Sequence, residues 1–139
     1  MTARFDRRRA GAILWLDSGA GLAAGATVLL TSHWLARVHE VAPGLVVMLG
    51  VTNVVYGSYS GLLATFASVR GRLPPRRAIE VLVAANLGWT CVCIGLVAKV
   101  ASTASIFFLG HVAFEGAFVA ALAAAEWLWV RPGTAALRG

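Results

Sequence analysis

The sequence carries little charge. Only 13% of its 139 residues are Asp, Glu, Lys or Arg, about half of what a soluble globular domain carries. Hydrophobic residues make up 59%, and a membrane-spanning helix needs about 20 mostly apolar residues. Four segments are long and apolar enough: 10–30, 44–69, 78–100 and 104–130. The sequence therefore predicts an all-α, integral membrane four-helix bundle that forms a single transmembrane domain over residues 1–139.

Cysteine is also scarce. Cys91 and Cys93 are the only two, and residues two apart lie on different faces of a helix. Their C-x-C spacing is not the C-x-x-C of redox motifs, and no G-x-S-x-G motif points to a serine nucleophile. We interpret both cysteines as small apolar packing residues.

Ligands for a metal or a haem are equally few. His111 and Glu115 supply two metal ligands at most, with Asp17 as the other evident donor, whereas zinc sites take three or four protein ligands. His111 is also the only histidine inside the apolar segments, which excludes a haem held by two histidines there. We therefore expect no metal and no cofactor.

Acidic residues are outnumbered by basic ones, six to twelve, and the net charge is +6. Two basic residues, Arg37 and Lys99, fall on one predicted side of the membrane. The other ten fall on the opposite side: Arg4, Arg7, Arg8, Arg9, Arg70, Arg72, Arg76, Arg77, Arg131 and Arg138. The positive-inside rule then places both termini and the 70–77 loop in the cytoplasm, at the cell (inner) membrane. These arginines are expected to attract anionic lipid head groups, not nucleic acid.

The basic start and the apolar run after it are also typical of a secretory signal peptide. However, the apolar run is longer than the usual apolar region of such a peptide. We therefore interpret residues 10–30 as the first spanning helix. Within it, Gly21 and Gly25 form a G-x-x-x-G pair that lets another helix approach closely, either within the bundle or in a homo-oligomer.

Polar residues inside the apolar segments are the candidates for function. At about 1.5 Å of rise per residue, Asp17, Asn53, Asn86 and Glu115 fall within roughly 5 Å of the middle of their segments. His111 lies one helical turn from Glu115, on the same face. Ionisable residues in hydrocarbon are costly and usually functional, although a purely structural role, in which Glu115 only holds helices together, stays open.

Aromatic residues accompany this polar layer. Tyr56, Trp89, Phe114 and Phe118 could form the walls of an apolar pocket with convergent polar groups, the usual form of a small-molecule site. Burial moves carboxyl pKa values towards neutral pH, which suits acid/base chemistry by Glu115, His111 and Asp17. Asn86 and the indole of Trp89 could stabilise a developing positive charge.

Polar residues nearer the ends have simpler interpretations. Residues 32–40 are expected to form a short interfacial helix with Trp34 at head-group level, and His33 and His39 to be solvated. Glu80 is expected to pair with an arginine of the 70–77 loop. Glu126 shares the stripe of His111 and Glu115 but is expected to form a surface pair with Arg131.

The segment His111-Val112-Ala113-Phe114-Glu115-Gly116 resembles the His-x-x-x-Glu-Gly helix of the emopamil-binding sterol isomerase (EXPERA) family. Asn86-x-x-Trp89 resembles that family's Asn-x-x-Trp, although the two motifs occur here in the reverse order. The resemblance covers about a tenth of the chain. It implies an acid/base role for His111 and Glu115 and cation support from Asn86 and Trp89. The overall length and four-helix layout are similar to small bacterial membrane proteins of the DoxX type.

Three functions remain open on the sequence. The first is an intramembrane pocket for an apolar or lipid-like molecule of the sterol or terpenoid type, with or without acid/base isomerase or cyclase activity. The second is a small proton-coupled transporter or channel, and the third is a structural subunit of a larger membrane complex. The shape of the interior distinguishes them: a pocket that opens sideways to lipid, a polar path to both faces, or a filled core.

Overall fold

The computed structural model describes residues 7–134, and no strand occurs in that range. The helices are α1 (Arg7–Leu30), α2 (Ser32–His39), α3 (Pro43–Arg70), α4 (Arg76–Val100) and α5 (Ile106–Ala125). A π-helical turn, η1 (Glu126–Val130), and a 3₁₀ turn, η2 (Arg131–Thr134), continue α5. Four helices are long and apolar enough to cross a membrane: α1, α3, α4 and the continuous segment Ile106–Thr134. The all-helical class and the four apolar helices are confirmed.

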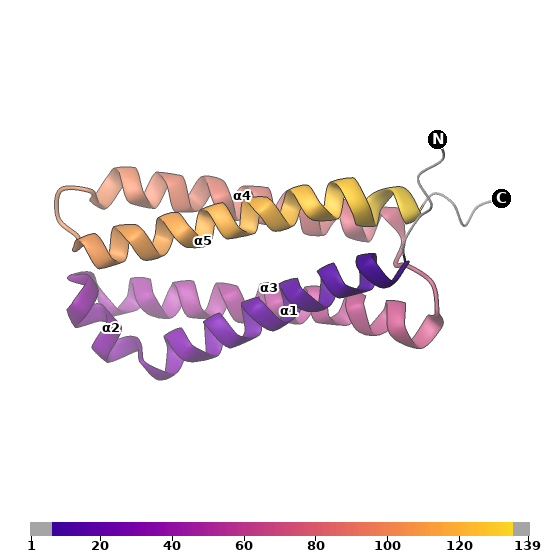
Figure 1. The fold of residues 1–139 in the computed structure, drawn as a ribbon. Coiled ribbons are helices and arrows are strands. Elements are labelled where there is room, and N and C mark those ends of the chain that lie inside the picture. Colours follow the sequence, from indigo (N-terminus) through magenta and orange to yellow (C-terminus); the bar gives the residue numbers. More distant parts are fainter. Residues whose placement is uncertain (1–6, 135–139) are drawn as a thin grey trace.

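The four long helices are arranged as two pairs. α1 packs along α3, α4 packs along α5, and contacts between the pairs are sparse over most of their length (Figure 1). α2 and the α4–α5 connection lie at one end of the molecule, and the α3–α4 connection lies at the other, near the first residues of α1 (Figure 1). Because the pairs touch mainly near the ends, room is left between them in the middle.

Glycine makes the α1–α3 contact close. A Cβ on Gly57 would lie 2.6 Å from the backbone nitrogen of Leu22, and a Cβ on Gly25 would lie 2.8 Å from the carbonyl oxygen of Gly50. Small residues of this kind let two helix backbones approach in a membrane. The Gly21/Gly25 motif therefore serves a contact inside this chain.

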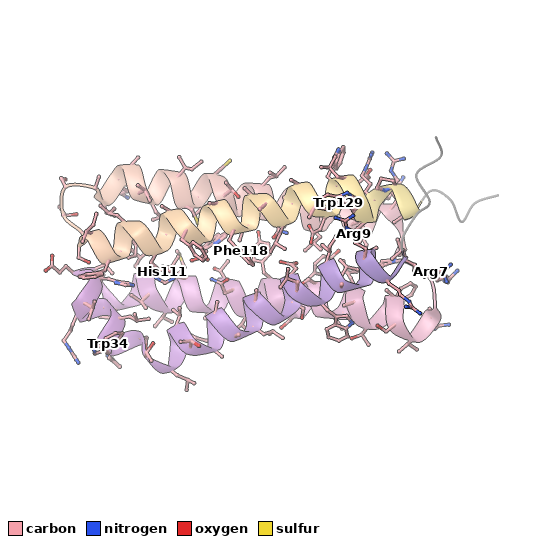
Figure 2. The ribbon with its side chains drawn as sticks, viewed as in Figure 1. Arg7, Arg9, Trp34, His111, Phe118 and Trp129 are labelled. Carbon is pink, nitrogen blue, oxygen red and sulfur yellow. The ribbon has the colours of Figure 1, made fainter. Side chains whose placement is uncertain are left out.

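Charged and aromatic side chains gather at the end where α1 begins (Figure 2). Glu80 accepts hydrogen bonds from Arg76 Nε at 2.8 Å and from Arg131 Nε at 2.9 Å. The guanidinium of Arg131 also lies over the ring of Trp127. The predicted pairing of Glu80 with a loop arginine is thus confirmed, whereas Arg131 does not pair with Glu126. Arg4 and Arg138 of the predicted basic set lie outside the described residues.

The opposite end is formed by α2. The predicted short helix at 32–40 is present as Ser32–His39, and Trp34 is exposed on it (Figure 2). Ser105 fixes α2 to α5, since its Oγ accepts from the backbone nitrogen of Phe108 and donates to the carbonyl oxygen of Val38 at 2.9 Å. This contact carries the last turn of α2 over one end of the bundle interior. From its position in the fold alone, we name this end the outer end and the end where α1 begins the inner end.

Candidate functional site

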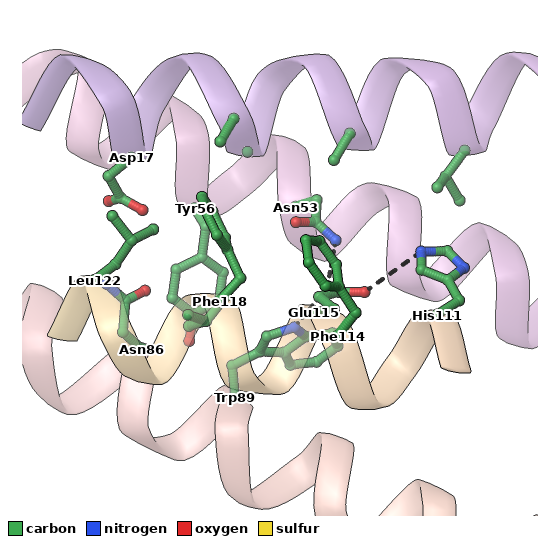
Figure 3. Close-up of a pocket in the computed structure, with 15 residues that line it drawn as sticks. Asp17, Asn53, Tyr56, Asn86, Trp89, His111, Phe114, Glu115, Phe118 and Leu122 are labelled. Carbon is green, nitrogen blue, oxygen red and sulfur yellow. Dashed lines mark hydrogen bonds and ion pairs between the residues drawn. The ribbon is translucent and has the colours of Figure 1, made fainter. Parts of the chain in front are cut away.

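A cavity of about 320 Å³ lies between the two helix pairs. All nine predicted site residues line it: Asp17, Asn53, Tyr56, Asn86, Trp89, His111, Phe114, Glu115 and Phe118. They come from all four long helices, and Figure 3 shows their side chains converging on one space. The polar residues that were predicted to share a depth in the membrane therefore also share a cavity.

The Glu115 carboxyl group accepts two hydrogen bonds inside the cavity. Its Oε1 accepts from Asn53 Nδ2 at 2.7 Å and from Trp89 Nε1 at 2.8 Å, and its Oε2 lies 3.8 Å from His111 Nε2 (Figure 3). Both N–H donors meet Oε1, so Oε2 is the oxygen that faces His111.

His111 continues this polar line towards the outer end. Its Nδ1 lies 3.1 Å from Nε2 of His39, and the edge of the Phe108 ring packs on the His39 imidazole. His39 is only 5% exposed, so the prediction that it is solvated is wrong, whereas His33 is exposed as expected. Burial, and secondarily the charge of a protonated His111, lowers the pKa of His39 below its ordinary value. No pattern in the sequence marks His39, because α2 must fold back over α5 before the two rings can meet.

The inner end of the cavity contains a residue that the sequence interpretation misplaced. Glu126 is fully buried, and its Oε2 accepts from Asn86 Nδ2 at 3.1 Å. Asp17, which lines the cavity and is 7% exposed, lies within hydrogen-bonding reach of Glu126. The expected surface pair with Arg131 is therefore wrong. The useful signal was the helical stripe that Glu126 shares with His111 and Glu115.

Aromatic rings and small residues form the apolar walls. Tyr56 and Trp89 lie 6.3 Å apart between ring centroids, and the Tyr56 hydroxyl donates to the carbonyl oxygen of Ala85. Phe114 stacks on Phe118 and is 72% exposed although it lines the cavity. The facing wall is the small-residue side of α1, including Ala20, Gly21 and Ala24. α1 and α5 make few contacts with each other. On this side the cavity is therefore bordered by the aromatic side chain of Phe114 and not by packed backbone.

Within residues 7–134, no three His, Cys, Asp or Glu side chains are placed to hold a metal ion together. Cys91 and Cys93 are not paired with each other. The chain matches no protein-family model, no curated protein and no solved structure.

Proposed function

We propose that this protein spans the cell (inner) membrane, with both termini and the 70–77 loop in the cytoplasm, and binds one apolar or lipid-like molecule in its central cavity. The sterol or terpenoid type is the best fit, because the walls are apolar and the polar groups are few and convergent. The observation that carries the proposal is the cavity of about 320 Å³ with a hydrogen-bonded carboxyl group inside it. Small-molecule pockets range from ~300 to ~1,000 Å³.

The side of the cavity between α1 and α5 supports access from lipid. Phe114 lines the cavity and is exposed on the outer surface of the bundle. A rotation of its side chain would widen the gap without breaking a helix. An apolar molecule could then reach Glu115 without leaving the hydrocarbon, which is the route expected for a lipid-like ligand and not for a water-soluble one.

The polar groups support acid/base chemistry on such a ligand. In an isomerisation, a proton is added to one carbon of a double bond and another proton is removed from a neighbouring carbon, so the net composition is unchanged. Glu115 Oε2 and His111 are placed to exchange a proton with each other and with the ligand. Asp17 lines the same cavity from the facing wall, on α1, and would exchange the second proton. The faces of Trp89 and Tyr56, with the amide oxygen of Asn86, would stabilise the cation formed in between.

Native mass spectrometry of the protein in mild detergent, followed by extraction and identification of bound lipids, tests this proposal. We expect a specific apolar ligand with the wild type and its loss or strong reduction in Glu115→Gln. The glutamine side chain carries no charge with which to accept the two N–H hydrogen bonds. Glu80→Gln is the matched control, because Glu80 lies outside the cavity and pairs with two arginines.

An apo-protein free of ligand in both forms would contradict the proposal. Equal amounts of ligand in wild type and Glu115→Gln would exclude Glu115 from binding. The same spectra give the number of copies in the particle and retained anionic lipids. They test the homo-oligomer that the sequence left open and the head-group contacts of the arginines.

A second function, proton-coupled transport, is favoured by a different observation. His39, His111 and Glu115 form a polar line at the outer end, while Asp17, Asn86 and Glu126 form a second group at the inner end. The cavity lies between these groups. Proton flux into liposomes containing the purified protein, reduced in Glu115→Gln, would favour transport over a binding or isomerase function.

A further inference from the structure

Asp17 and Glu126 are two carboxyl groups from opposite helix pairs that meet inside the bundle. Asp17 comes from α1 and Glu126 from the first residue of η1. Asp17 is 93% buried and Glu126 completely buried, and the two side chains lie within hydrogen-bonding reach of each other. Asp17 lines the cavity, whereas Glu126 does not. Asp17 is therefore the member of the pair that faces the cavity, and Glu126 does not contact the cavity space.

The hydrogen bonds around the pair leave one oxygen of each carboxyl group without a donor. Glu126 Oε2 accepts from Asn86 Nδ2, and Asp17 is also within reach of Ser60. Asp17 Oδ2 and Glu126 Oε1 are buried and have no hydrogen-bond partner in the described part of the chain. Buried polar atoms are nearly always paired, so an unpaired oxygen on each of two neighbouring carboxyl groups calls for an explanation.

Among residues 7–134, the groups known to face the pair supply no positive charge to balance two anions. α3 contributes the neutral Tyr56 and Ser60, and α4 contributes the neutral amide of Asn86. The ion pairs of residues 7–134 involve Glu80 and Glu115, and neither Asp17 nor Glu126. Arg131, the basic residue next to η1, is bonded to Glu80 and stacked on Trp127.

Two adjacent carboxylates in this setting would both be desolvated and would repel each other, and such groups take up a proton instead. A single proton held between the two carboxyl groups would supply a hydrogen-bond donor where the neighbours offer too few. We propose that Asp17 and Glu126 share one proton and act as a proton-holding carboxyl pair at the inner end of the cavity, with Asn86 orienting Glu126.

This pair differs from Glu115 in what its neighbours offer. Glu115 receives two N–H donors, whereas each carboxyl group of the Asp17–Glu126 pair has an oxygen without a donor and the pair retains a proton. The cavity thus has a proton acceptor towards its outer end and a proton holder at its inner end. Glu126 also begins a π-helical turn, a local helix distortion that is frequent at functional sites. The inference rests on the cavity and needs no particular ligand.

Infrared spectroscopy of the ligand-free protein, titrated with pH, tests the pair directly. We expect a protonated-carboxyl band at neutral pH that shifts in deuterated water and is lost in the double variant Asp17→Asn/Glu126→Gln. Each amide has the shape of the acid it replaces and can donate an N–H to its neighbour, so the fold should persist. Glu80→Gln is the control and should leave this band unchanged, because Glu80 is paired with two arginines outside the cavity.

The single variant Glu126→Gln provides a second measurement if the double variant does not fold. It keeps an acceptor for Asn86 and replaces the shared proton by an amide hydrogen, so the band should be lost or shifted. An unchanged band in Glu126→Gln, or no protonated carboxyl in the wild type at neutral pH, overturns the proposal. Loss of the co-purified lipid has no bearing on this band, so failure of the pair and failure of the proposed function are distinguishable.

Discussion

At the scale of single residues, the neighbours of each glutamate decide what it can do. Glu80 lies between Arg76 and Arg131 and is a structural anion. Glu115 accepts from two neutral N–H groups inside a cavity. Glu126 faces another carboxyl group and an amide. One residue type therefore has three different surroundings within one chain: two arginines, two neutral N–H donors, and a second carboxyl group with an amide.

The histidine pair at the outer end makes stability depend on pH. The folded state lowers the pKa of His39, so the unfolded chain binds a proton more readily than the folded protein. The free energy of unfolding is then highest above the ordinary pKa of 6.5 and decreases as pH falls from there to the lower folded-state pKa. Thermal unfolding of the purified protein at a series of pH values measures this.

His39→Gln should remove the part of the pH dependence that arises from this contact. His33→Gln is the matched control, since His33 lies on the same short helix and is exposed. If the two variants show the same pH dependence as the wild type, His39 is not the group that titrates.

At the scale of helices, the close α1–α3 pair forms one rigid wall of the cavity. A Cβ at Gly57 would meet the Leu22 nitrogen at 2.6 Å, a backbone atom that cannot move without shifting α1. Gly57→Ala should therefore destabilise the protein by ~1–3 kcal/mol, the usual cost of overpacking. Unfolding in a denaturing detergent, followed by circular dichroism, gives the value.

Gly19→Ala is the control for this substitution, because a Cβ there meets no atom within 4 Å. We expect it to be neutral or slightly stabilising, since alanine is the better helix former. If the two alanine substitutions changed the free energy of unfolding equally, α1 and α3 would not approach as closely at Gly57 as the 2.6 Å distance indicates.

At the scale of the whole molecule, the basic residues should set the orientation in the membrane. In a background of Cys91→Ala and Cys93→Ala, single cysteines are introduced by Thr103→Cys and Arg72→Cys. Both positions are exposed, and they lie at opposite ends of α4. We expect a membrane-impermeant maleimide to label position 103 in intact cells and position 72 only after the membrane is opened.

Charge reversal gives a second view of the same orientation. Arg77→Glu leaves the Arg76–Glu80–Arg131 contacts in place while reversing a charge in the first turn of α4. Combined with Arg72→Cys it should yield mixed labelling, with some copies inverted. Labelling of position 72 in intact cells that carry Arg72→Cys without Arg77→Glu would place the 70–77 loop outside and contradict the predicted orientation.

The class of this protein follows from the sequence alone. Four long apolar runs require four helices because, in hydrocarbon, a helix satisfies its own backbone hydrogen bonds. The polar residues of the middle layer could also be identified, since Asp17, Asn53, Asn86 and Glu115 stand out against apolar neighbours and their depth follows from the helical rise. Their common cavity is consistent with that expectation.

Only the tertiary structure decided which polar groups meet at the two ends of the cavity. His39 appeared solvated and Glu126 appeared to face Arg131, because local sequence shows a residue's own helix and not the helices that cover it. The fold of α2 over α5 buries His39 against His111, and the packing of α1 against η1 buries Glu126 against Asp17. The predicted depth of a residue in the membrane can be counted along its own helix. The residues that it contacts depend on how the two helix pairs are placed side by side.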